Sequence, residues 1–329
     1  MEALFKNVNI WLFLSFALLF SYMSNILVSG GAGFIGSTLV DALLAQGHKV
    51  TVLDSLVSGR RDYVNKAADF WELDILDENL KDMFLSSKFD FVYHLAAQID
   101  VRISVEDPVL DNRINVIGGL NILEAARLSG VKKVIMASTG GAIYGETDEI
   151  PTPETAPAYP LSPYGINKLA LEKYLNYYYQ VYNLDYSILR FSNVYGPRQY
   201  KGGEAGVIAI FTDALANDKP CVIYGDGKQT RDYVYVDDVV AALIKAAEVG
   251  YQGEINISTA KEIDIWQMIS AIEKAADKKL QTSLAPGRKG EQRCSCLSNR
   301  RAQEILGWRP QVSFEEGTAR TYKWVARQV

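Results

Sequence analysis

A glycine-rich turn constrains the fold of this chain more than any other sequence feature. Residues 30–36 read Gly-Gly-Ala-Gly-Phe-Ile-Gly, directly after the apolar run Asn25–Ser29 and at the start of an amphipathic stretch. Gly30 and Gly33 allow a tight turn in which the backbone approaches a pyrophosphate, and Gly36 lets the following helix pack closely on the strand. The N-terminus of that helix supplies N–H donors and the positive end of a dipole. The residues expected at the phosphates of a dinucleotide are Gly30, Gly33, Phe34, Ile35 and Gly36.

A carboxylate ends the second expected strand. Asp54 lies 18 residues beyond Gly36, where it can accept hydrogen bonds from the adenosine ribose and repel a 2′-phosphate. This favours NAD over NADP, although Arg60–Arg61 close by leave NADP open. Asp74–Ile75, after the third expected strand, are placed to flank the adenine.

Periodicity indicates the fold class. From Asn25 to about Val194, short strand-like runs alternate with amphipathic stretches, which predicts an α/β fold with a doubly wound parallel (Rossmann) sheet. Beyond Tyr195, turn-rich segments predict a smaller C-terminal α/β lobe that binds the substrate. We assign residues 23–194 to the dinucleotide-binding domain and 195–329 mainly to the substrate-binding lobe. The expected strands are Asn25–Ser29, Lys49–Leu53, Phe70–Glu72, Phe91–His94, Lys133–Ala137 and Tyr186–Phe191, and the expected helices are Phe34–Gln46, Pro108–Ser129, Ser162–Tyr182 and Phe314–Arg327.

Residues 1–22 form an apolar N-terminal extension. The apolar stretch Ile10–Met23 has 14 residues, whereas a membrane span needs about 20. It is similar to a signal-peptide core, but it lacks a small-residue cleavage site and the first strand follows at once. We interpret it as an extension upstream of a natural start at Met23, in preference to a membrane anchor.

Composition excludes several classes of function. Of the 329 residues 48% are apolar, enough for a large core, and the net charge of -5 without a long basic run does not favour nucleic acid as a partner. Only His48 and His94 are histidines, which excludes most histidine-based metal or triad chemistry. Cys221, Cys294 and Cys296 lack the spacing of a zinc site, so we expect reduced thiols, a cytoplasmic protein and no metal.

Tyr164 and Lys168 form the candidate catalytic pair. Their spacing of four near the start of an expected helix places the phenol and the ammonium on one face, about a turn apart. A tyrosine is a poor base at neutral pH, but a neighbouring cation and an oxidised nicotinamide both favour its phenolate. Such a pair alone is more often an exposed surface pair, and its significance comes from the dinucleotide signature upstream. Tyr164 is therefore expected to remove a hydroxyl proton.

Further motifs follow in order along the chain. They are the run His94-Leu95-Ala96-Ala97, Asn115, the segment RFSNVYGPR at 190–198 and the segment GDGKQTRDY at 225–233. With these motifs, the chain from about Asn25 to its C-terminus resembles the extended short-chain dehydrogenase/reductase family. Within it, the chain is most similar to the NAD-dependent nucleotide-sugar epimerases, in particular UDP-glucose 4-epimerases.

This resemblance implies further site residues. Those lining the cofactor would be Leu95, Ala96, Ala97, Gln98 and Asn115, and Lys168 would hydrogen-bond the nicotinamide ribose. Asn193 and the backbone of Gly206–Val207 would hold the sugar nucleotide, while Arg231 and Arg288 would bind its diphosphate through bidentate hydrogen bonds. Glu291 and Arg293 would complete the nucleotide side of the cleft, with a charged loop as the simpler interpretation of Arg293.

One position departs from the family pattern. Many members carry a serine or threonine that hydrogen-bonds the reacting oxygen at the position of Gly140, within the segment STGGAIYG at 138–145. Either Ser138 or Thr139 takes this role, or a water replaces the hydroxyl, or the substrate relies on Tyr164 alone. Loss of one such hydrogen bond is expected to slow catalysis without abolishing it.

The resemblance implies epimerisation at carbon 4 of a UDP-hexose through a 4-keto sugar. UDP-glucuronate and UDP-N-acetylhexosamines are the close alternatives. A dehydratase or decarboxylase is disfavoured because Gly141–Ala142 occupy the place of its acidic residues. A non-catalytic NAD-binding sensor has no reason to keep Tyr164 and Lys168. The family also implies a homodimer through the helices expected at 108–129 and 162–182.

Overall fold

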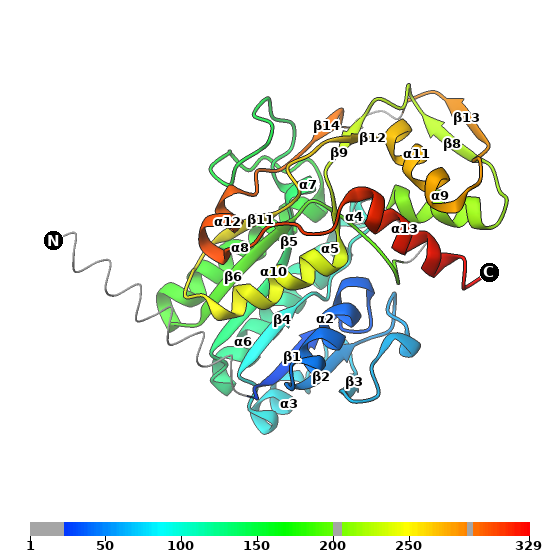
Figure 1. Ribbon diagram of the computed structural model, residues 1–329. Coiled ribbons are helices and arrows are strands. Elements are labelled where there is room, and N and C mark those ends of the chain that lie inside the picture. Colours follow the sequence, from blue (N-terminus) through cyan, green and yellow to red (C-terminus); the bar gives the residue numbers. More distant parts are fainter. Residues whose placement is uncertain (1–22, 200–205, 288–291) are drawn as a thin grey trace.

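A seven-stranded, all-parallel sheet forms the centre of the computed structural model, which describes residues 23–199, 206–287 and 292–329 (Figure 1). Its strand order is β11-β6-β5-β4-β1-β2-β3. The strands are β1 (Asn25–Ser29), β2 (Lys49–Asp54), β3 (Asp69–Glu72), β4 (Phe91–His94), β5 (Lys133–Thr139), β6 (Asp185–Phe191) and β11 (Glu254–Ile257). The order reverses between β1 and β4, and the carboxyl ends of strands at such a point form a ligand crevice. The expected α/β fold class is confirmed.

Helices cover both faces of the sheet. On one face lie α2 (Phe34–Ala45) and α10 (Val236–Glu248), side by side in Figure 1. On the other lie α3 (Leu80–Ser87), α6 (Gly119–Ser129) and α8 (Pro163–Tyr182). Alternation along β1 divides the core accordingly: Ile26 packs towards α2 and α10, and Leu27 packs towards α3, α6 and α8.

The connection between β4 and β5 is a nearly continuous helical run with one irregular turn. It comprises α4 (Val101–Glu106), α5 (Pro108–Asn112), the π-helical turn η2 (Arg113–Gly118) and α6. The helix expected over residues 108–129 is therefore present but is widened at η2. Such π-helical turns are frequent at functional sites.

Within the described residues, the smaller lobe consists of three small sheets and three helices. Its sheets pair β7 (Asn193–Tyr195) with β10 (Tyr233–Tyr235), β8 (Cys221–Tyr224) with β13 (Thr282–Ala285), and β9 (Thr230–Arg231) with β12 (Ile263–Asp264) and β14 (Cys294–Ser295). Its helices α9 (Val207–Ala216), α11 (Ile265–Ala276) and α13 (Phe314–Val325) share an apolar core with β7, β8, β10 and β12. The chain also returns to the main sheet through β11, and α12 (Arg300–Leu306) packs beside that strand.

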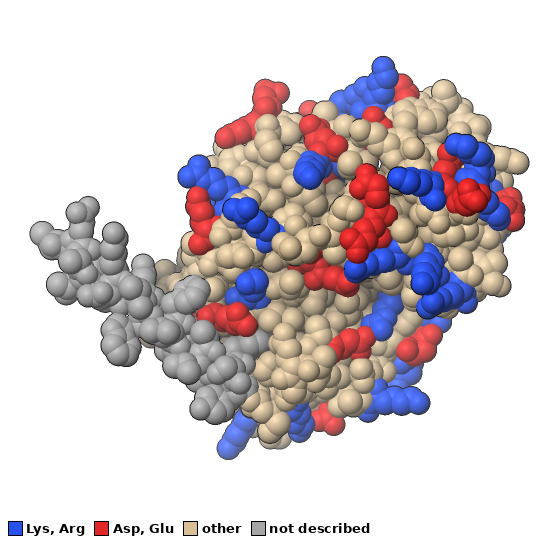
Figure 2. Space-filling view, viewed as in Figure 1, with Lys and Arg blue, Asp and Glu red and all other residues tan. Residues whose placement is uncertain are grey.

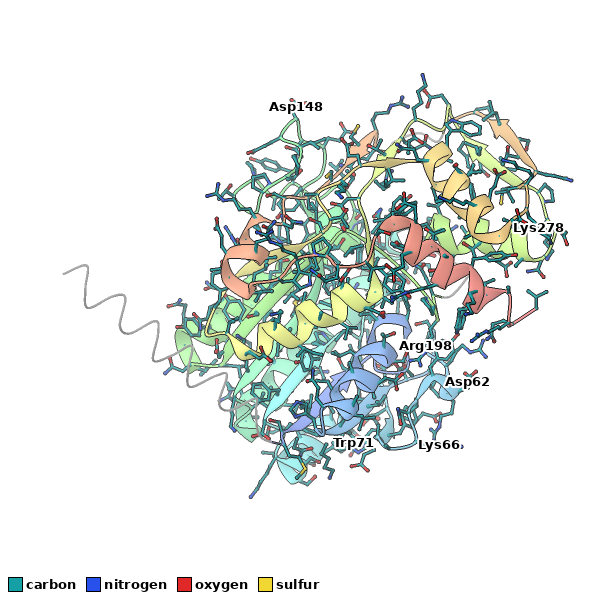
Figure 3. The ribbon with its side chains drawn as sticks, viewed as in Figure 1. Asp62, Lys66, Trp71, Asp148, Arg198 and Lys278 are labelled. Carbon is teal, nitrogen blue, oxygen red and sulfur yellow. The ribbon has the colours of Figure 1, made fainter. Side chains whose placement is uncertain are left out.

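The two lobes are joined by contacts of the segment after β7. Arg198, labelled in Figure 3, forms an ion pair with Asp41 of α2 (2.7 Å) and lies over the ring of Tyr63 (5.8 Å). This contact links the start of the smaller lobe to the first helix of the sheet domain.

The surface carries both signs of charge. Figure 2 shows lysine and arginine interspersed with aspartate and glutamate on the visible face. Among the residues that the structure describes, no helix combines the length and the apolar character needed to cross a membrane. The extension 1–22 lies outside the described residues.

Candidate active site

The turn after β1 leaves no room for side chains at two of its glycines. Gly30 has φ +74°, and a Cβ there would stand 2.7 Å from the backbone nitrogen of Ala96. A Cβ on Gly36 would stand 2.0 Å from the carbonyl oxygen of Gly30. The turn therefore lies directly against the carboxyl end of β4, and α2 packs tightly upon it. This is the cradle that a pyrophosphate requires.

Asp54 is buried beside this turn. Its carboxylate accepts hydrogen bonds from the backbone N–H of Ala32 (3.0 Å) and of Leu56 (2.9 Å). The nearby guanidinium groups are occupied by carboxylates, since Arg60 pairs with Asp62 and Arg61 pairs with Glu72. The structure therefore disfavours the NADP alternative, because a 2′-phosphate would meet Asp54 and arginines whose charge is already offset.

The segment after β3 presents one buried and one exposed residue. Ile75 is buried against Gly118, and its carbonyl accepts a hydrogen bond from Asn121 (3.0 Å). Asp74 is exposed, and its carboxylate accepts from the N–H of Leu76 (2.9 Å). The pair thus lies at the carboxyl end of β3, the position expected of residues that flank an adenine.

The segment after β4 is anchored by Asn115 of η2. The side chain of Asn115 accepts from the N–H of Gln98 (3.0 Å) and donates to its carbonyl (2.9 Å). Residues 95–98 are all partly exposed and run past the glycine turn. Asn115 therefore holds the backbone of the expected cofactor-lining segment at two points.

Lys168 is buried close to the end of β4. Its side chain is 4% exposed, and burial lowers the pKa of its ammonium to about 8, partly offset by Glu172 and Asp111. Burial and the Lys168 cation lower the pKa of His94 to about 3, so His94 is neutral and shares a hydrogen bond with Ser29 (2.8 Å). His94 is thus a structural neighbour of Lys168, the candidate catalytic lysine.

The N-terminus of α8 is fixed against the segment after β5. Ser162 caps the helix by accepting from the N–H of Gly165 (3.2 Å). A Cβ on Gly165 would stand 2.5 Å from the carbonyl oxygen of Ala142. Tyr164, which precedes this glycine, therefore lies beside the segment that carries the serine and threonine candidates.

The structure separates those two hydroxyl candidates. Ser138 is buried and donates to Glu172 (2.6 Å). Thr139 is partly exposed, and its Oγ1 lies 3.9 Å from the point where a Cβ on Gly141 would stand. Oδ1 of Asn193 lies at the same distance from that point. Thr139 and Asn193 therefore border one space above the exposed Gly141.

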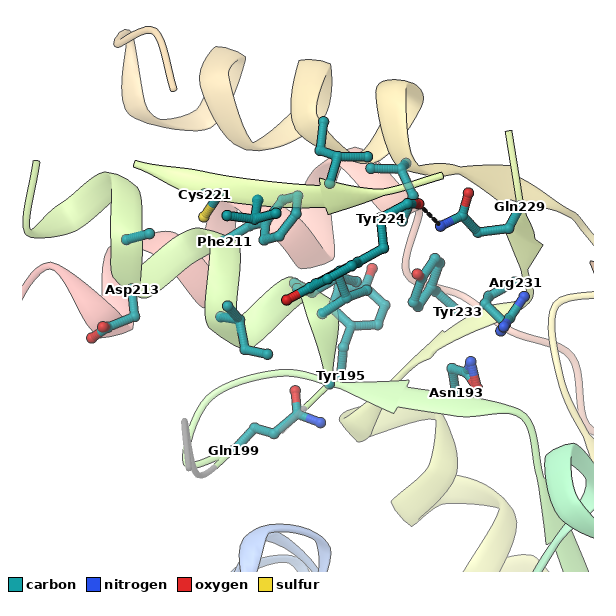
Figure 4. Close-up of a pocket in the computed structure, with 18 of the residues that line it drawn as sticks. Asn193, Tyr195, Gln199, Phe211, Asp213, Cys221, Tyr224, Gln229, Arg231 and Tyr233 are labelled. Carbon is teal, nitrogen blue, oxygen red and sulfur yellow. Dashed lines mark hydrogen bonds between the residues drawn. The ribbon is translucent and has the colours of Figure 1, made fainter. Parts of the chain in front are cut away.

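A cavity of about 760 Å³ extends from Asn193 into the smaller lobe (Figure 4). Four of the expected substrate residues line it: Asn193, Gly206, Val207 and Arg231. Figure 4 shows Asn193 and Arg231 near one another, with Tyr224 across the cavity. The N-terminal end of α9, which begins at Val207, also faces this space.

Of the remaining expected substrate residues, Arg293 is the one that the structure describes, and it does not line this cavity. Arg293 is exposed and forms a bidentate ion pair with Asp226 (2.9 and 3.1 Å), which lowers the pKa of Asp226 to about 2. It belongs to a charged loop in this structure, the simpler of its two interpretations. Arg288 and Glu291 lie outside the described residues.

Asp232 connects Asn193, which lines the cavity, to two other segments of the chain. Its buried carboxylate accepts from the backbone of Thr259 (2.9 Å), Ala260 (3.0 Å) and Leu297 (3.4 Å), and from the hydroxyl of Thr259 (2.7 Å). Its carbonyl accepts from the N–H of Asn193 (2.9 Å). One residue thus fixes β7, the turn after β11 and the strand segment after β14.

The sequence from residue 26 to 258 matches the NAD dependent epimerase/dehydratase family. The chain belongs to this family. Its dependence on NAD agrees with the glycine cradle and the buried Asp54.

Similar proteins cover nearly the whole chain. It is 46% identical over 304 residues to the UDP-glucose 4-epimerase of Mycolicibacterium smegmatis, a match that spans 91% of this chain and 97% of that one. The crystal structure of UDP-glucose 4-epimerase from Thermotoga maritima with UDP-glucose matches with TM-score 0.91 and 45% identity, covering 92% of this chain and 99% of that one. The crystal structure of Thermus thermophilus UDP-glucose 4-epimerase in complex with NAD matches with TM-score 0.87 and 44% identity, covering 93% of this chain and 100% of that one.

Three features of this family member escaped the sequence analysis. β8 lines the cavity, and its exposed residues Val222 and Tyr224 alternate with buried ones, a period of two that is visible in the sequence. Glu172, four residues after Lys168, is buried with Arg190, and its helical spacing was a usable signal. Asp111 is fully buried, and no local pattern distinguishes it from a surface acid.

Proposed function

We propose that the chain catalyses NAD-dependent epimerisation at carbon 4 of UDP-glucose and UDP-galactose through a 4-keto sugar. The observation that carries this proposal is the position of Tyr164. It stands at the start of α8 beside residues 139–142, while Asn193 connects that segment to a cavity lined by Arg231. The likeness to UDP-glucose 4-epimerases over 91% of the chain supports the same substrate.

The cofactor would be held by residues of the sheet domain. Gly30, Gly33 and the first turn of α2 with Phe34 and Ile35 would bind the pyrophosphate, and Asp54 the adenosine ribose. At this site NAD would supply reversible hydride transfer at carbon 4 of the sugar. Lys168 would hydrogen-bond the nicotinamide ribose. Asp74–Ile75 would flank the adenine, and Leu95, Ala96, Ala97, Gln98 and Asn115 would line the remaining surface.

Proton transfer would belong to Tyr164. Its phenolate, stabilised by the Lys168 ammonium, would take the proton of the 4-hydroxyl and later return it. The hydroxyl of Thr139 would donate to the reacting oxygen, because that of Ser138 is engaged by Glu172. Thr139 would thereby replace the hydroxyl that position 140 lacks.

The nucleotide would occupy the cavity of the smaller lobe. Arg231 would bind the diphosphate, Asn193 and the Gly206–Val207 backbone would hold the sugar nucleotide, and the exposed faces of Val222 and Tyr224 would contact the base. We accordingly propose that residues 23–194 bind mainly the cofactor and residues 195–329 mainly the substrate.

A stripe of exposed apolar residues supports a homodimer. Ile166, Tyr174, Tyr177 and Val181 are 40–55% exposed and recur along one face of α8. Ile117 of η2, next to α8, is 45% exposed. We propose that these residues pack against their equivalents in a second copy. The three free thiols support a reducing, cytoplasmic location.

Product analysis tests the proposed reaction. Purified protein with NAD is incubated separately with UDP-galactose, UDP-glucuronate and UDP-N-acetylglucosamine, and the 4-epimers are separated by chromatography. We expect conversion of UDP-galactose at the highest kcat/KM. The Tyr164→Phe variant should retain NAD and lose turnover. Absence of UDP-glucose among the products, or parental turnover by Tyr164→Phe, contradicts the proposal.

A further inference from the structure

Asp111 is a fully buried carboxylate next to the segment expected to line the cofactor. It lies in the short helix α5 and is 0% exposed. One oxygen accepts from the side chains of Gln98 (2.7 Å) and Asn115 (3.0 Å), and the other accepts from Asn167 (2.7 Å). All three donors are neutral amides, so they satisfy the hydrogen-bonding capacity of the carboxylate but do not balance its charge.

Asn167, which donates to Asp111, directly precedes Lys168 on α8, and α5 packs against this helix. The buried Lys168 is therefore within electrostatic range of two carboxylates, Glu172 one turn further along α8 and Asp111 on α5. Glu172 already has a cation of its own, because Arg190 of β6 donates to both of its oxygens (2.5 and 3.0 Å). It also accepts from Ser138 (2.6 Å). Arg190 therefore balances Glu172, and the charge of Asp111 remains to balance that of Lys168.

We propose that Asp111 is a positioning residue for the reaction: it keeps the buried Lys168 protonated and in place beside Tyr164. This inference rests on the proposed function. An ammonium buried without a counter-charge loses its proton readily, and the tyrosine then loses the cation that favours its phenolate. The hydrogen bonds of Asp111 to Gln98 and Asn115 connect this charge to the segment expected to line the cofactor.

The other titratable groups around Lys168 in the described part of the chain do not replace Asp111. Glu172 interacts with it from its own helix, where Tyr164 precedes it by four residues, and His94 interacts with it from β4. His94 is neutral because burial and Lys168 lower its pKa to about 3. Of the two described carboxylates that interact with Lys168, Asp111 is therefore the one not already paired with arginine.

The Asp111→Asn variant removes the charge and preserves the hydrogen bonds. The new amide oxygen continues to accept from Gln98 and Asn115. The new amide nitrogen requires an acceptor, which Asn167 provides when its amide flips. Asn112, which donates to Asn167 (2.9 Å), is exposed and can flip in turn. Asp82→Asn on α3, an exposed acid far from the site in sequence, is the matched control.

The first test is the pH dependence of turnover with UDP-galactose. For Asp111→Asn we expect the alkaline limb of kcat to move to lower pH by about one unit or more. KM and bound NAD should stay within about twofold of the parent, which a general structural defect would not achieve. Asp82→Asn should behave as the parent. An alkaline limb at the parental pH in Asp111→Asn overturns the inference.

The second test measures the pairing itself and does not depend on turnover. Melting temperatures are compared for the parent, Asp111→Asn, Lys168→Met and the double variant. If the two charges balance one another, the decrease in melting temperature of the double variant is smaller than the decreases of the two single variants added together, because neither charge is left buried alone. Additive effects overturn the inference. If the parent fails to epimerise while the cycle shows coupling, the proposed reaction fails and the charge pairing stands.

Discussion

Gly140 lies in contact with Leu297, a residue 157 positions further along the chain: a Cβ on Gly140 would stand 2.2 Å from Cδ1 of Leu297. The family position that elsewhere carries a hydroxyl is therefore closed by a buried leucine. Gly140 begins the short helix α7 (Gly140–Ile143) directly after β5, and the segment after β14 packs against it so closely that a serine side chain there would meet Leu297.

We expect Gly140→Ser to destabilise the protein by about 1–3 kcal/mol without raising kcat, because the new side chain overpacks against Leu297. Thermal unfolding and steady-state kinetics measure the two effects. Gly141→Ser is the control for stability, since a Cβ at Gly141 meets its nearest atoms at 3.9 Å. Higher activity of Gly140→Ser at unchanged stability would contradict this prediction and show that the Leu297 side chain moves to accommodate the serine.

Removal of the Thr139 hydroxyl tests its proposed hydrogen bond. We expect Thr139→Ala to lower kcat about a hundredfold, with a small change in KM, because the bond is strongest as charge develops on the reacting oxygen. Thr139→Ser keeps the hydroxyl and should retain most of the activity. Equal kcat for Thr139→Ala and the parent would assign the role to water or to Tyr164 alone.

Asp54→Asn tests the assignment of the adenosine ribose. We expect the Kd for NAD to rise about tenfold or more, since hydrogen bonds to a charged acceptor are lost. NADP should still bind more weakly than NAD because Arg60 and Arg61 remain paired. Titration calorimetry of the cofactor-free protein measures both constants. A variant that prefers NADP would contradict the interpretation of the two arginines.

Lys133 predicts how stability depends on pH. Its side chain is fully buried at the start of β5, and burial lowers the pKa of its ammonium from 10.5 to about 8, partly offset by Asp185. Between these values the unfolded chain binds more protons than the folded chain, so the folded state gains stability as pH rises. Relative to Lys133→Met, we expect the parental free energy of unfolding to increase by about 3 kcal/mol across this window. Denaturant titrations at several pH values measure it, and parallel curves would contradict it.

A charge on the exposed stripe of α8 tests the proposed homodimer. Val181→Lys places a buried cation in the interface and is expected to yield monomers. Leu85→Lys, near the end of α3 and similarly apolar and exposed in the parent, is the control and should stay dimeric. Light scattering after size exclusion gives the mass. A dimeric Val181→Lys would place the interface elsewhere.

Local patterns were sufficient for most of the sheet domain. The six strands expected from short apolar runs all occur, two of them with the expected bounds and four with ends that differ by at most two residues, because each run carries its own periodicity and turn signals. β11 was not anticipated. Its four residues pair with β6, which lies more than sixty residues earlier in the sequence. Local sequence patterns do not indicate a pairing over that distance.

The candidate site likewise combines features that local sequence predicts with features that depend on residues distant in sequence. The glycine turn, Asp54 and the Tyr164–Lys168 pair follow from spacing along one element, and the structure has them where strand and helix ends meet. The contact of Gly140 with Leu297 and the burial of Asp111 depend on residues distant in sequence. The pairing of Arg293 with Asp226 likewise became evident only from the fold.

The carboxylate of Asp232 has a consequence for how a keto sugar could be inverted. Because this residue holds the backbone of Thr259–Ala260 and of Leu297 through its carboxylate, and the N–H of Asn193 through its carbonyl, the wall of the cavity next to Asn193 has little freedom to rearrange within a catalytic cycle. A sugar that must expose first one face and then the other would have to rotate about its own glycosidic and phosphate bonds. The binding site would stay rigid during the reaction, and the rotation would take place within the ligand.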